Sequence, residues 1–293
     1  MRILLSGGTG FLGAAVAEHF SGLGHDVHLL TRRPVEASVF PVVVFDGDVR
    51  SLARQMQNQS IEAVVHLASL FLSDHQPEQL DDLVQSNITL GLKLLEAMSL
   101  SGVRFFLNTG TSWQNHLNED YHPVNLYSAT KQAFEDLLRY YHEARGIQAL
   151  TLRLFDTYGP ADNRRKLFFL LGQAYLNGEV LQMSPGEQSI DLVHVDDVVQ
   201  AYGQALVYLT NGALHPCEVF AVSSEHPLPL KTLVERYEAI LGQKLAAFGG
   251  RPYRQREVMQ TWSGYSLLPG WHARVSLEQG LQQMALKLKS SRT

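Results

Sequence analysis

Cysteine is almost absent from this sequence, since Cys217 is the only one among 293 residues. A single thiol excludes a disulfide within the chain and a zinc site built from several cysteines, and we expect Cys217 to be a buried strand residue. The 12 histidines show no HExxH-like or other ligand spacing. We therefore interpret them as scattered surface or capping residues and predict no metal site.

Long hydrophobic runs and an excess of basic charge are also missing. No stretch reaches the roughly 18 apolar residues that a membrane-spanning helix needs, and only a few apolar residues precede the first glycines. The net charge is -5, the isoelectric point is about 6.2, and the basic residues are scattered. We expect a soluble, cytoplasmic protein that binds neither nucleic acid nor a membrane.

What the sequence does contain, in its first half, is an alternation of short apolar runs with amphipathic stretches. This pattern is typical of a parallel sheet covered by helices on both faces. We expect strands at residues 3–6, 27–31, 42–45, 63–67, 104–108 and 149–154. Between them we expect helices near residues 11–23, 50–58, 79–100 and 125–145. Right-handed crossovers then predict an α/β fold with a doubly wound parallel sheet of the Rossmann type.

The regular alternation stops after Leu154, where Gly159, Pro160 and Asn163 are turn signals. Later helices are expected near residues 165–177, 196–209, 229–241 and 276–289, and strands near 189–193 and 217–222. A less regular half suits a smaller, mainly C-terminal α/β domain that binds substrate over the strand ends. We predict a dinucleotide-binding domain of residues 1–155 and 189–212, and a substrate-binding domain of residues 156–188 and 213–293.

Gly7, Gly10 and Gly13 lie between the first expected strand and the first expected helix. This order matches a dinucleotide-binding turn, in which glycines allow a tight turn, a close approach of the pyrophosphate, and close packing of helix on strand. The helix N-terminus would face the phosphates with its unpaired N–H groups. A glycine-rich loop that merely turns the chain is the alternative.

Arg32 and Arg33 follow the second expected strand, where an acidic residue would bind the ribose hydroxyls of NAD. Two guanidinium groups suit a 2′-phosphate, so NADP(H) is favoured as cofactor, with NAD(H) possible. Asp48, after the third strand, is a candidate partner for the adenine amino group. The alternatives are solvated loop arginines and a surface turn carboxylate.

Tyr127 and Lys131 are one helical turn apart in NLYSATKQAFEDLLRYY, and Thr111 lies upstream in FFLNTGTS. Residues four apart share a helix face, so a phenol and an ammonium can converge on one site, unless the pair simply belongs to a solvated face. The phenol can protonate the alkoxide that forms when a ketone accepts hydride, while the ammonium favours the phenolate. Lys131 can also hold the nicotinamide ribose. Thr111 can orient the carbonyl oxygen, although it could instead bond its own backbone.

Motifs along nearly the whole chain resemble one known family: GGTGFLG, HLAS at 66–69, Asn87, YSATK at 127–131, RLFDTYGP at 153–160 and LVHVDDVV at 192–199. These are the extended short-chain dehydrogenase/reductases, the NAD(P)-dependent epimerase/dehydratase-like enzymes of nucleotide-sugar metabolism. Within the family, NTGTSW, NLYSATKQAFED and FDTYGPADNRRKLF look like the CDP-abequose synthase-like nucleotide-sugar 4-ketoreductases. Asp156 stands where the common pattern has asparagine, a form shared with that subgroup.

The resemblance implies a role for each matching residue. Tyr127 would be the acid, Lys131 its partner and Thr111 the hydroxyl that orients the carbonyl. Further cofactor contacts are implied for Thr9, Phe11, Leu12, Val49, Leu67, Ala68, Ser69, Asn87, Thr109, Phe155 and Thr157. Substrate contacts are implied for Thr111, Asp156, Asn163, Arg164 and Lys166. A basic helix start at the surface is the competing interpretation of the last three.

The residues after Thr111 and the two arginines after the second expected strand indicate which reaction to expect. Ser112 and Trp113 follow Thr111 where the 4,6-dehydratases of this family carry an Asp-Glu pair, so dehydration is disfavoured. An epimerase keeps NAD bound, whereas a reductase consumes NADPH. Arg32 and Arg33 favour NADPH and therefore a reductase. We predict NADPH-dependent reduction of the 4-keto group of a nucleotide-linked 4-keto-6-deoxyhexose in deoxysugar and polysaccharide biosynthesis. The alternatives are an epimerase with tightly bound NAD and, with less support, a non-catalytic dinucleotide sensor.

The expected helices at 79–100 and 125–145 carry apolar residues on more than one face. In relatives such helices pair across a two-fold axis as a four-helix bundle, so the resemblance implies a homodimer. The expected partners are therefore a nucleotide-sugar substrate and a second copy of the chain. No motif specifies the nucleotide (CDP, dTDP, UDP or GDP) or the configuration of the new hydroxyl.

Overall fold

A seven-stranded parallel sheet forms the centre of the protein in the computed structural model, which describes residues 1–212 and 217–290. Its strands are β1 (Arg2–Ser6), β2 (Asp26–Thr31), β3 (Val42–Val44), β4 (Ala63–His66), β5 (Phe105–Thr111), β6 (Gln148–Leu154) and β11 (Glu218–Val222). They lie in the order β11-β6-β5-β4-β1-β2-β3. The order reverses direction after β1, as in a doubly wound sheet, which confirms the predicted fold class.

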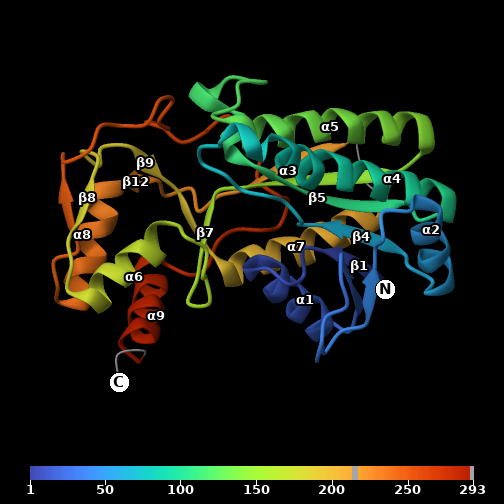
Figure 1. Ribbon diagram of the computed structural model, residues 1–293, viewed down its shortest axis with the longest axis horizontal. Helices are drawn as coiled ribbons and strands as arrows, with labels where there is room; N and C mark the ends of the chain where they lie inside the picture. Colours follow the sequence, from blue (N-terminus) through green and yellow to red (C-terminus); the bar gives the residue numbers. More distant parts are fainter. Residues whose placement is uncertain (213–216, 291–293) are drawn as a thin grey trace.

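Helices cover both faces of this sheet (Figure 1). One face carries α1 (Phe11–Gly22) and α7 (Val195–Thr210), and the other carries α2 (Val49–Asn58), α4 (Leu90–Ser101) and α5 (Leu126–Arg145). Neighbouring strand residues serve opposite faces, since Leu5 packs in the α1–α7 core and Leu4 in the α2–α4–α5 core. Both faces are therefore apolar, which explains why the strands read as continuous hydrophobic runs.

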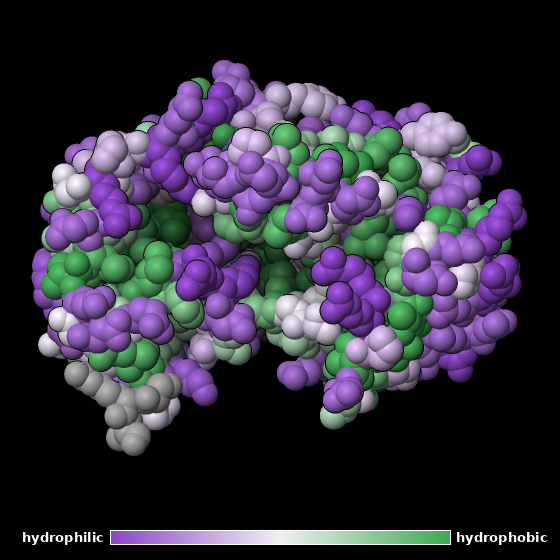
Figure 2. All heavy atoms as spheres, in the orientation of Figure 1, coloured by the Kyte–Doolittle hydropathy of each residue, from purple (hydrophilic) through white to green (hydrophobic). Residues whose placement is uncertain are grey.

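The second part of the protein packs around a third core of its own. Its helices are α6 (Leu167–Asn177), α8 (Leu230–Leu241) and α9 (Leu277–Ser290). The strands outside the central sheet form three two-stranded ladders. They are β7 (Asp156–Tyr158) with β10 (Leu192–His194), β9 (Ser189–Ile190) with β12 (Leu228–Pro229), and β8 (Leu181–Met183) with β13 (Ala246–Phe248). Figure 2 shows a hollow between this part and the sheet at the lower edge of the view. No helix of the described residues is long and apolar enough to span a membrane.

Two segments belong to a different domain from the one predicted for them. β11 pairs with β6 along its whole length, so residues 218–222 complete the central sheet rather than the substrate-binding part. Ser189 and Ile190, predicted within the dinucleotide-binding domain, instead pair with β12 in the smaller part. The physical reason is that β6 has an open edge, and β11 covers it with an apolar strand. The predicted boundaries need moving at these two places.

The helix expected at 79–100 is interrupted. A short 3₁₀ turn, η1 (Pro77–Gln79), leads into α3 (Leu80–Val84), then into a π-helical segment, η2 (Gln85–Thr89), and then into α4. Such bulges are frequent at functional sites. Here the bulge places Asn87, which is 1% exposed, on the inner side of the helix. Two more 3₁₀ turns, η3 (Ser112–Gln114) and η4 (His116–Asn118), follow β5.

Two expectations about single side chains were wrong. Cys217 is only half-buried and lies just before β11 with a φ of 50°, rather than inside a strand. His66 and His28 are 1% and 8% exposed and lie on β4 and β2, so they are not surface residues. The reason is the same for both histidines: they occupy strands whose two faces are each covered by helices.

Candidate active site

The glycine turn between β1 and α1 has the close packing that a dinucleotide cradle needs. A Cβ on Gly13 would lie 2.0 Å from the carbonyl oxygen of Gly7, and a Cβ on Gly7 would lie 2.6 Å from the backbone nitrogen of Ala68. Gly10 differs, because a Cβ there meets only the Gly7 oxygen, at 3.4 Å. Gly7 and Gly13 therefore allow close backbone packing, whereas Gly10 leaves space beside the start of α1.

Among the described residues, no side chain caps the N-terminus of α1, where a phosphate would bind. Gly10 is the N-cap, no side chain caps the helix, and its first turn has no acidic residue. Thr9 is exposed, while Phe11 and Leu12 are half-buried in this turn. These observations fit a bound pyrophosphate, which would take the unpaired N–H groups and the positive end of the helix dipole.

Arg32 and Arg33 are exposed after the end of β2, and neither guanidinium makes a hydrogen bond or ion pair within the described residues. Asp48 is the N-cap of α2, where one carboxylate oxygen accepts from the backbone N–H groups of Arg50 (2.7 Å) and Ser51 (3.0 Å). These backbone hydrogen bonds lower the pKa of Asp48. The capping role leaves its second oxygen available to an adenine amino group, and Val49 begins the helix beside it.

The loop after β4 is held in place by Asn87. Its amide oxygen accepts from the Leu70 N–H at 2.7 Å, and its amide nitrogen donates to the Leu70 carbonyl at 3.0 Å and to Thr130 at 2.9 Å. The side chain of Asn87 is thus occupied by bonds to protein, and its contact with the cofactor stays a prediction. Through them Asn87 positions the preceding loop residues that were predicted to line the cofactor, Leu67, Ala68 and Ser69.

Tyr127 lies in the first turn of α5, beside this loop. Its ring meets Phe71 edge-on, with centroids 5.0 Å apart. Burial raises the pKa of its phenol to about 12, against opposing effects from a hydrogen bond with Ser69 and from the charge of Arg164, while Asp156 adds to the rise. The phenol therefore holds its proton at neutral pH, as a general acid requires.

Lys131 is one turn further along α5 and only 2% exposed. Burial lowers the pKa of its amine to about 8, and the carboxylate of Glu135 opposes that fall. The amine makes no hydrogen bond to any described residue, which fits a bound ribose hydroxyl. The charge of Arg164, which comes from a different segment, lowers the pKa of Tyr127, and the expected effect of Lys131 on the phenol stays a prediction.

Thr111 ends β5 and is 9% exposed. Its hydroxyl accepts from the Trp113 N–H at 3.3 Å, so the local bond considered from sequence does form, while the hydroxyl hydrogen remains available. No hydrogen bond joins Thr111 to Tyr127. Thr109 shares a 2.7 Å hydrogen bond with Tyr202 of α7, and its predicted contact with the cofactor stays a prediction.

His66 is a site residue that the sequence interpretation missed. Its Nδ1 bonds the Ser6 hydroxyl at 2.7 Å, and that hydroxyl also accepts from the Ala68 N–H at 3.3 Å. Burial, reinforced by the charge of Lys131, lowers the pKa of His66 to about 3. A neutral histidine therefore ties the glycine-turn strand to the cofactor loop. The sequence signal that could have identified His66 is its position in the HLAS motif.

A cavity of about 270 Å³ opens between the sheet and the smaller part. Phe155 and Thr157, predicted near the nicotinamide, line it, as do Asp156 and Lys166, whose charged groups are 4.0 Å apart. Burial raises the pKa of Asp156 and lowers that of Lys166. Asn163 is exposed and is not part of the lining. The predicted substrate residues therefore do not all share one wall.

Arg164 reaches toward the start of α1 as well as toward Asp156 and Lys166 of the cavity. Its guanidinium covers the ring of Phe11 at 4.8 Å, donates to the Thr157 carbonyl at 2.8 Å and pairs with Asp162 at 2.6 Å. Because Phe11 begins α1, this places a cation between the helix start and Tyr127. The prediction had assigned Arg164 to the substrate.

Apart from Lys166, sequence reasoning did not find the aromatic and basic wall of the cavity. Phe71 packs on Trp113 with ring centroids 5.7 Å apart, and the Lys166 amine lies 4.5 Å above the Phe71 ring. Arg254 lies over Trp113 at 5.7 Å, and Arg165 also lines the cavity. No motif signalled Arg254, because it comes from a loop far along the chain from Tyr127.

Comparisons with known proteins agree with this arrangement. A model of the NAD dependent epimerase/dehydratase family matches residues 3–215. CDP-abequose synthase of Salmonella muenchen is 26% identical over 289 residues, covering 97% of this chain and 96% of that protein. UDP-glucose 4-epimerase of Corynebacterium glutamicum is 24% identical over 279 residues, covering 84% and 82%.

A solved structure shares the whole fold. UDP-glucose 4-epimerase of Thermotoga maritima, with UDP-glucose, superposes with a TM-score of 0.85 at 24% identity, and 99% of each chain is covered. Both the motifs and the architecture therefore lead to one assignment. The chain belongs to the NAD dependent epimerase/dehydratase family.

Proposed function

We propose that this protein uses NADPH to reduce the 4-keto group of a nucleotide-linked 4-keto-6-deoxyhexose. The observation that carries the proposal is the pairing of a protonated phenol with a buried amine on one face of α5, beside the glycine turn. Burial raises the pKa of Tyr127 to about 12 and lowers that of Lys131 to about 8. The similarity to CDP-abequose synthases supports a nucleotide-sugar substrate.

Each residue then has a separate task. A bound reduced nicotinamide would supply the hydride. Tyr127 would donate its phenolic proton to the oxygen on which negative charge develops, and Thr111 would orient that oxygen with its free hydroxyl hydrogen. Lys131 would hold the cofactor ribose through its unpaired amine. Arg164 would keep positive charge close to the phenol as the proton leaves.

The cavity suits the remainder of such a substrate. Arg165, Lys166 and Arg254 line it and can pair with a diphosphate, while Phe71 and Trp113 offer apolar faces to a base or sugar. Lining carboxylates, among them Asp156, offer hydrogen-bond acceptors to sugar hydroxyls. The roles in polysaccharide biosynthesis and the cytoplasmic location stay predictions.

The choice of NADPH over NADH rests on Arg32 and Arg33. Both are exposed at the end of β2 and lack protein partners within the described residues, so they are available to a 2′-phosphate. Relatives described as NAD complexes of 4-epimerases support the alternative, an epimerase with tightly bound NAD.

Purified protein incubated with a panel of CDP-, dTDP-, UDP- and GDP-4-keto-6-deoxy sugars tests the proposal. We expect one of them to consume NADPH, measured as loss of absorbance, and to yield a 4-hydroxy product by NMR. Tyr127→Phe should abolish turnover and leave NADPH binding nearly intact. Interconversion of UDP-sugars without added NADPH would instead favour the epimerase, and full activity in Tyr127→Phe would refute the proposed acid.

A further inference from the structure

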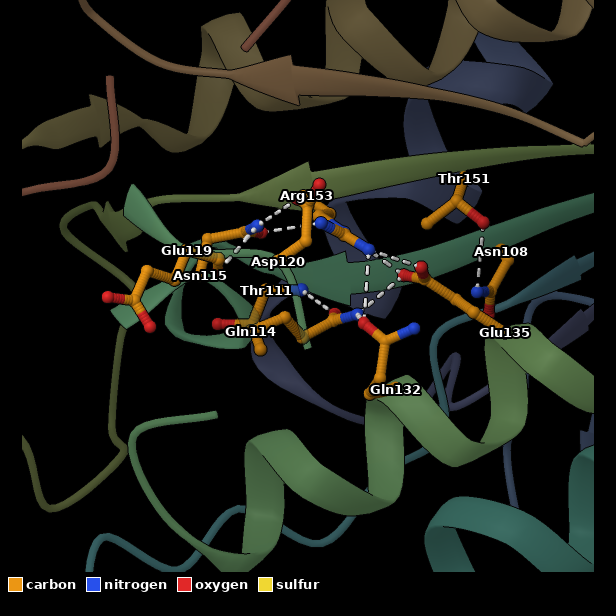
Figure 3. Close-up of polar contacts among 10 residues, drawn as sticks. All are labelled: Asn108, Thr111, Gln114, Asn115, Glu119, Asp120, Gln132, Glu135, Thr151 and Arg153. Atoms are coloured by element: carbon orange, nitrogen blue, oxygen red, sulfur yellow. Dashed lines mark hydrogen bonds and ion pairs between the residues drawn. The ribbon is translucent and has the colours of Figure 1, made fainter. Parts of the chain in front are cut away.

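A cluster of buried and half-buried polar side chains lies behind the end of β5 that carries Thr111. Figure 3 shows Gln114 of η3, Gln132 and Glu135 of α5 and Arg153 of β6 pointing toward one another. Gln114 is fully buried and Arg153 is 9% exposed. None of these residues was given a role from the sequence, although Gln132, Glu135 and Arg153 lie within the quoted motifs. We call these four residues the Gln114 cluster.

Gln114 uses both ends of its amide. Its oxygen accepts from the backbone N–H of Thr111 at 2.9 Å, and its nitrogen donates to Glu135 at 2.8 Å and to Gln132 at 3.1 Å. One side chain therefore joins the last residue of β5 to the second and third turns of α5. Those are the turns that follow Tyr127 and include Lys131.

Glu135 is itself fixed from the other side. The guanidinium of Arg153 contacts both of its carboxylate oxygens, at 2.6 Å and 3.3 Å, and donates to the side chain of Asn115. Glu135 also follows Lys131 by one helical turn, and its charge acts on the Lys131 amine. A buried network whose members are all satisfied is stiff, because any displacement leaves a polar group unpaired.

The strand passes close to these side chains at Gly110. A Cβ on Gly110, the residue before Thr111, would lie 2.8 Å from both the Gln114 and the Glu135 side-chain oxygens. β5 therefore approaches the cluster as closely as a residue without a side chain allows.

We propose that Gln114 is a positioning residue for catalysis: by bridging the Thr111 backbone to Glu135, it sets the place of the Thr111 hydroxyl relative to Tyr127 and Lys131. This inference deepens the proposed function and rests on it. Gln114 is not among the residues that line the cavity proposed for the substrate. It acts through Thr111, so its loss should change the rate of the chemical step more than cofactor binding.

Gln114→Met keeps the volume and removes the bridge. We expect kcat to fall roughly tenfold to a hundredfold while the KM for NADPH changes less than about twofold, because small displacements of reacting groups cost large factors in rate. Tyr141→Phe is the matched control, since it removes a 2.8 Å hydrogen bond between α5 and Glu96 far from Thr111. Equal kcat in Gln114→Met and the control would overturn the proposal.

Gln114→Glu keeps the shape and the bond from Thr111 but loses the donor toward Glu135. The introduced carboxyl faces Glu135 and Arg153, with Lys131 behind Glu135, and the neighbouring carboxylate raises its pKa. Once protonated it can donate again. We therefore expect kcat of Gln114→Glu, relative to wild type, to recover as the pH falls. A ratio that is independent of pH would count against the bridge.

A structural measurement separates this inference from the proposed function. Crystal structures of wild type and Gln114→Met should differ in the distance between the Thr111 and Tyr127 hydroxyl oxygens. An unchanged distance would contradict the positioning role even if no sugar in the panel is reduced. Reduction by wild type with an unaffected Gln114→Met would leave the proposed function standing and remove only the role of Gln114.

Discussion

Lys131 carries an amine into the protein interior, where it is 2% exposed and where burial lowers its pKa from 10.5 to about 8. The unfolded chain therefore binds this proton more tightly than the folded protein. Below about pH 8 the buried charge costs stability, and that cost disappears as the pH rises from 8 toward 10.5. The residue is retained at the expense of stability, as expected of a functional group.

Lys131→Met should therefore abolish turnover and raise the melting temperature at pH 7. The gain should be on the order of 1–3 kcal/mol in free energy of unfolding and should shrink as the pH approaches 10. Thermal denaturation at pH 7 and pH 9.5 measures it. Lys244→Met is the control, because that side chain is 65% exposed and no such gain is expected. A variant no more stable than wild type at pH 7 would contradict the cost assigned to burial.

Arg32 and Arg33 allow a second prediction at this scale. Replacing both with glutamine should weaken NADPH binding by roughly tenfold or more and NADH binding by less than about twofold, because only the 2′-phosphate needs the guanidinium groups. Isothermal titration with each cofactor provides the comparison. Arg145→Gln, at the far end of α5, controls for loss of surface charge. An equal loss for both cofactors would remove the argument for phosphate recognition.

Helix α1 shows how one element depends on its first turn. Its hydrophobic residues pack on the sheet, while Gly13 must lie against the Gly7 carbonyl for that packing to occur. Gly22, at the other end of the same helix, lies in open space, since a Cβ added there would meet no atom within 4 Å. A substitution at Gly13 therefore tests tertiary packing, and a substitution at Gly22 tests helix propensity, within the same helix.

Gly13→Ala should weaken NADPH and NADH alike and lower the melting temperature, because the added Cβ would lie 2.0 Å from a backbone oxygen. Gly22→Ala should leave cofactor binding unchanged and stabilise the helix by about 0.5–1 kcal/mol. Fluorescence titration and thermal denaturation of both variants make the comparison. Cofactor binding by Gly13→Ala at wild-type affinity would show that the turn tolerates the displacement.

The π-helical segment η2 is an element that sequence patterns could not reveal. Its residues continue the amphipathic pattern of α3 and α4, so a single helix over 79–100 is the natural expectation. Within the interruption, Asn87 bonds both backbone groups of Leu70, a residue of a separate loop, and the pattern along the helix does not show this contact. By contrast, α5 begins at Leu126 with Asn125 as its N-cap, a local signal that places Tyr127 and Lys131 correctly.

At the scale of the whole molecule, the outer helices leave apolar side chains uncovered. Leu80 and Val84 of α3 are 43% and 44% exposed, Leu100 of α4 is 45% and Tyr140 of α5 is 55%. These helices form one layer on the same face of the sheet (Figure 1). Such a layer suits the homodimer that the family resemblance implies, in which two copies pair these helices.

We therefore expect wild-type protein to be a dimer at micromolar concentration by multi-angle light scattering. Val84→Glu combined with Tyr140→Glu should shift it toward monomer, because charged groups would be buried in the interface. Leu286→Glu, on α9 and 75% exposed, is the control and should leave the mass unchanged. A wild-type monomer under these conditions would contradict the predicted dimer.

The sequence by itself determined the parallel sheet, the glycine turn and the pairing of Tyr127 with Lys131. These features depend on periodicity within one strand or helix, and backbone geometry converts such spacing directly into position. Only the tertiary structure decided that β11 completes the sheet, that Arg164 reaches Tyr127, and that Gln114 joins Thr111 to α5. Those contacts link segments whose relative placement depends on how helices pack across the sheet, and no spacing along the chain encodes it.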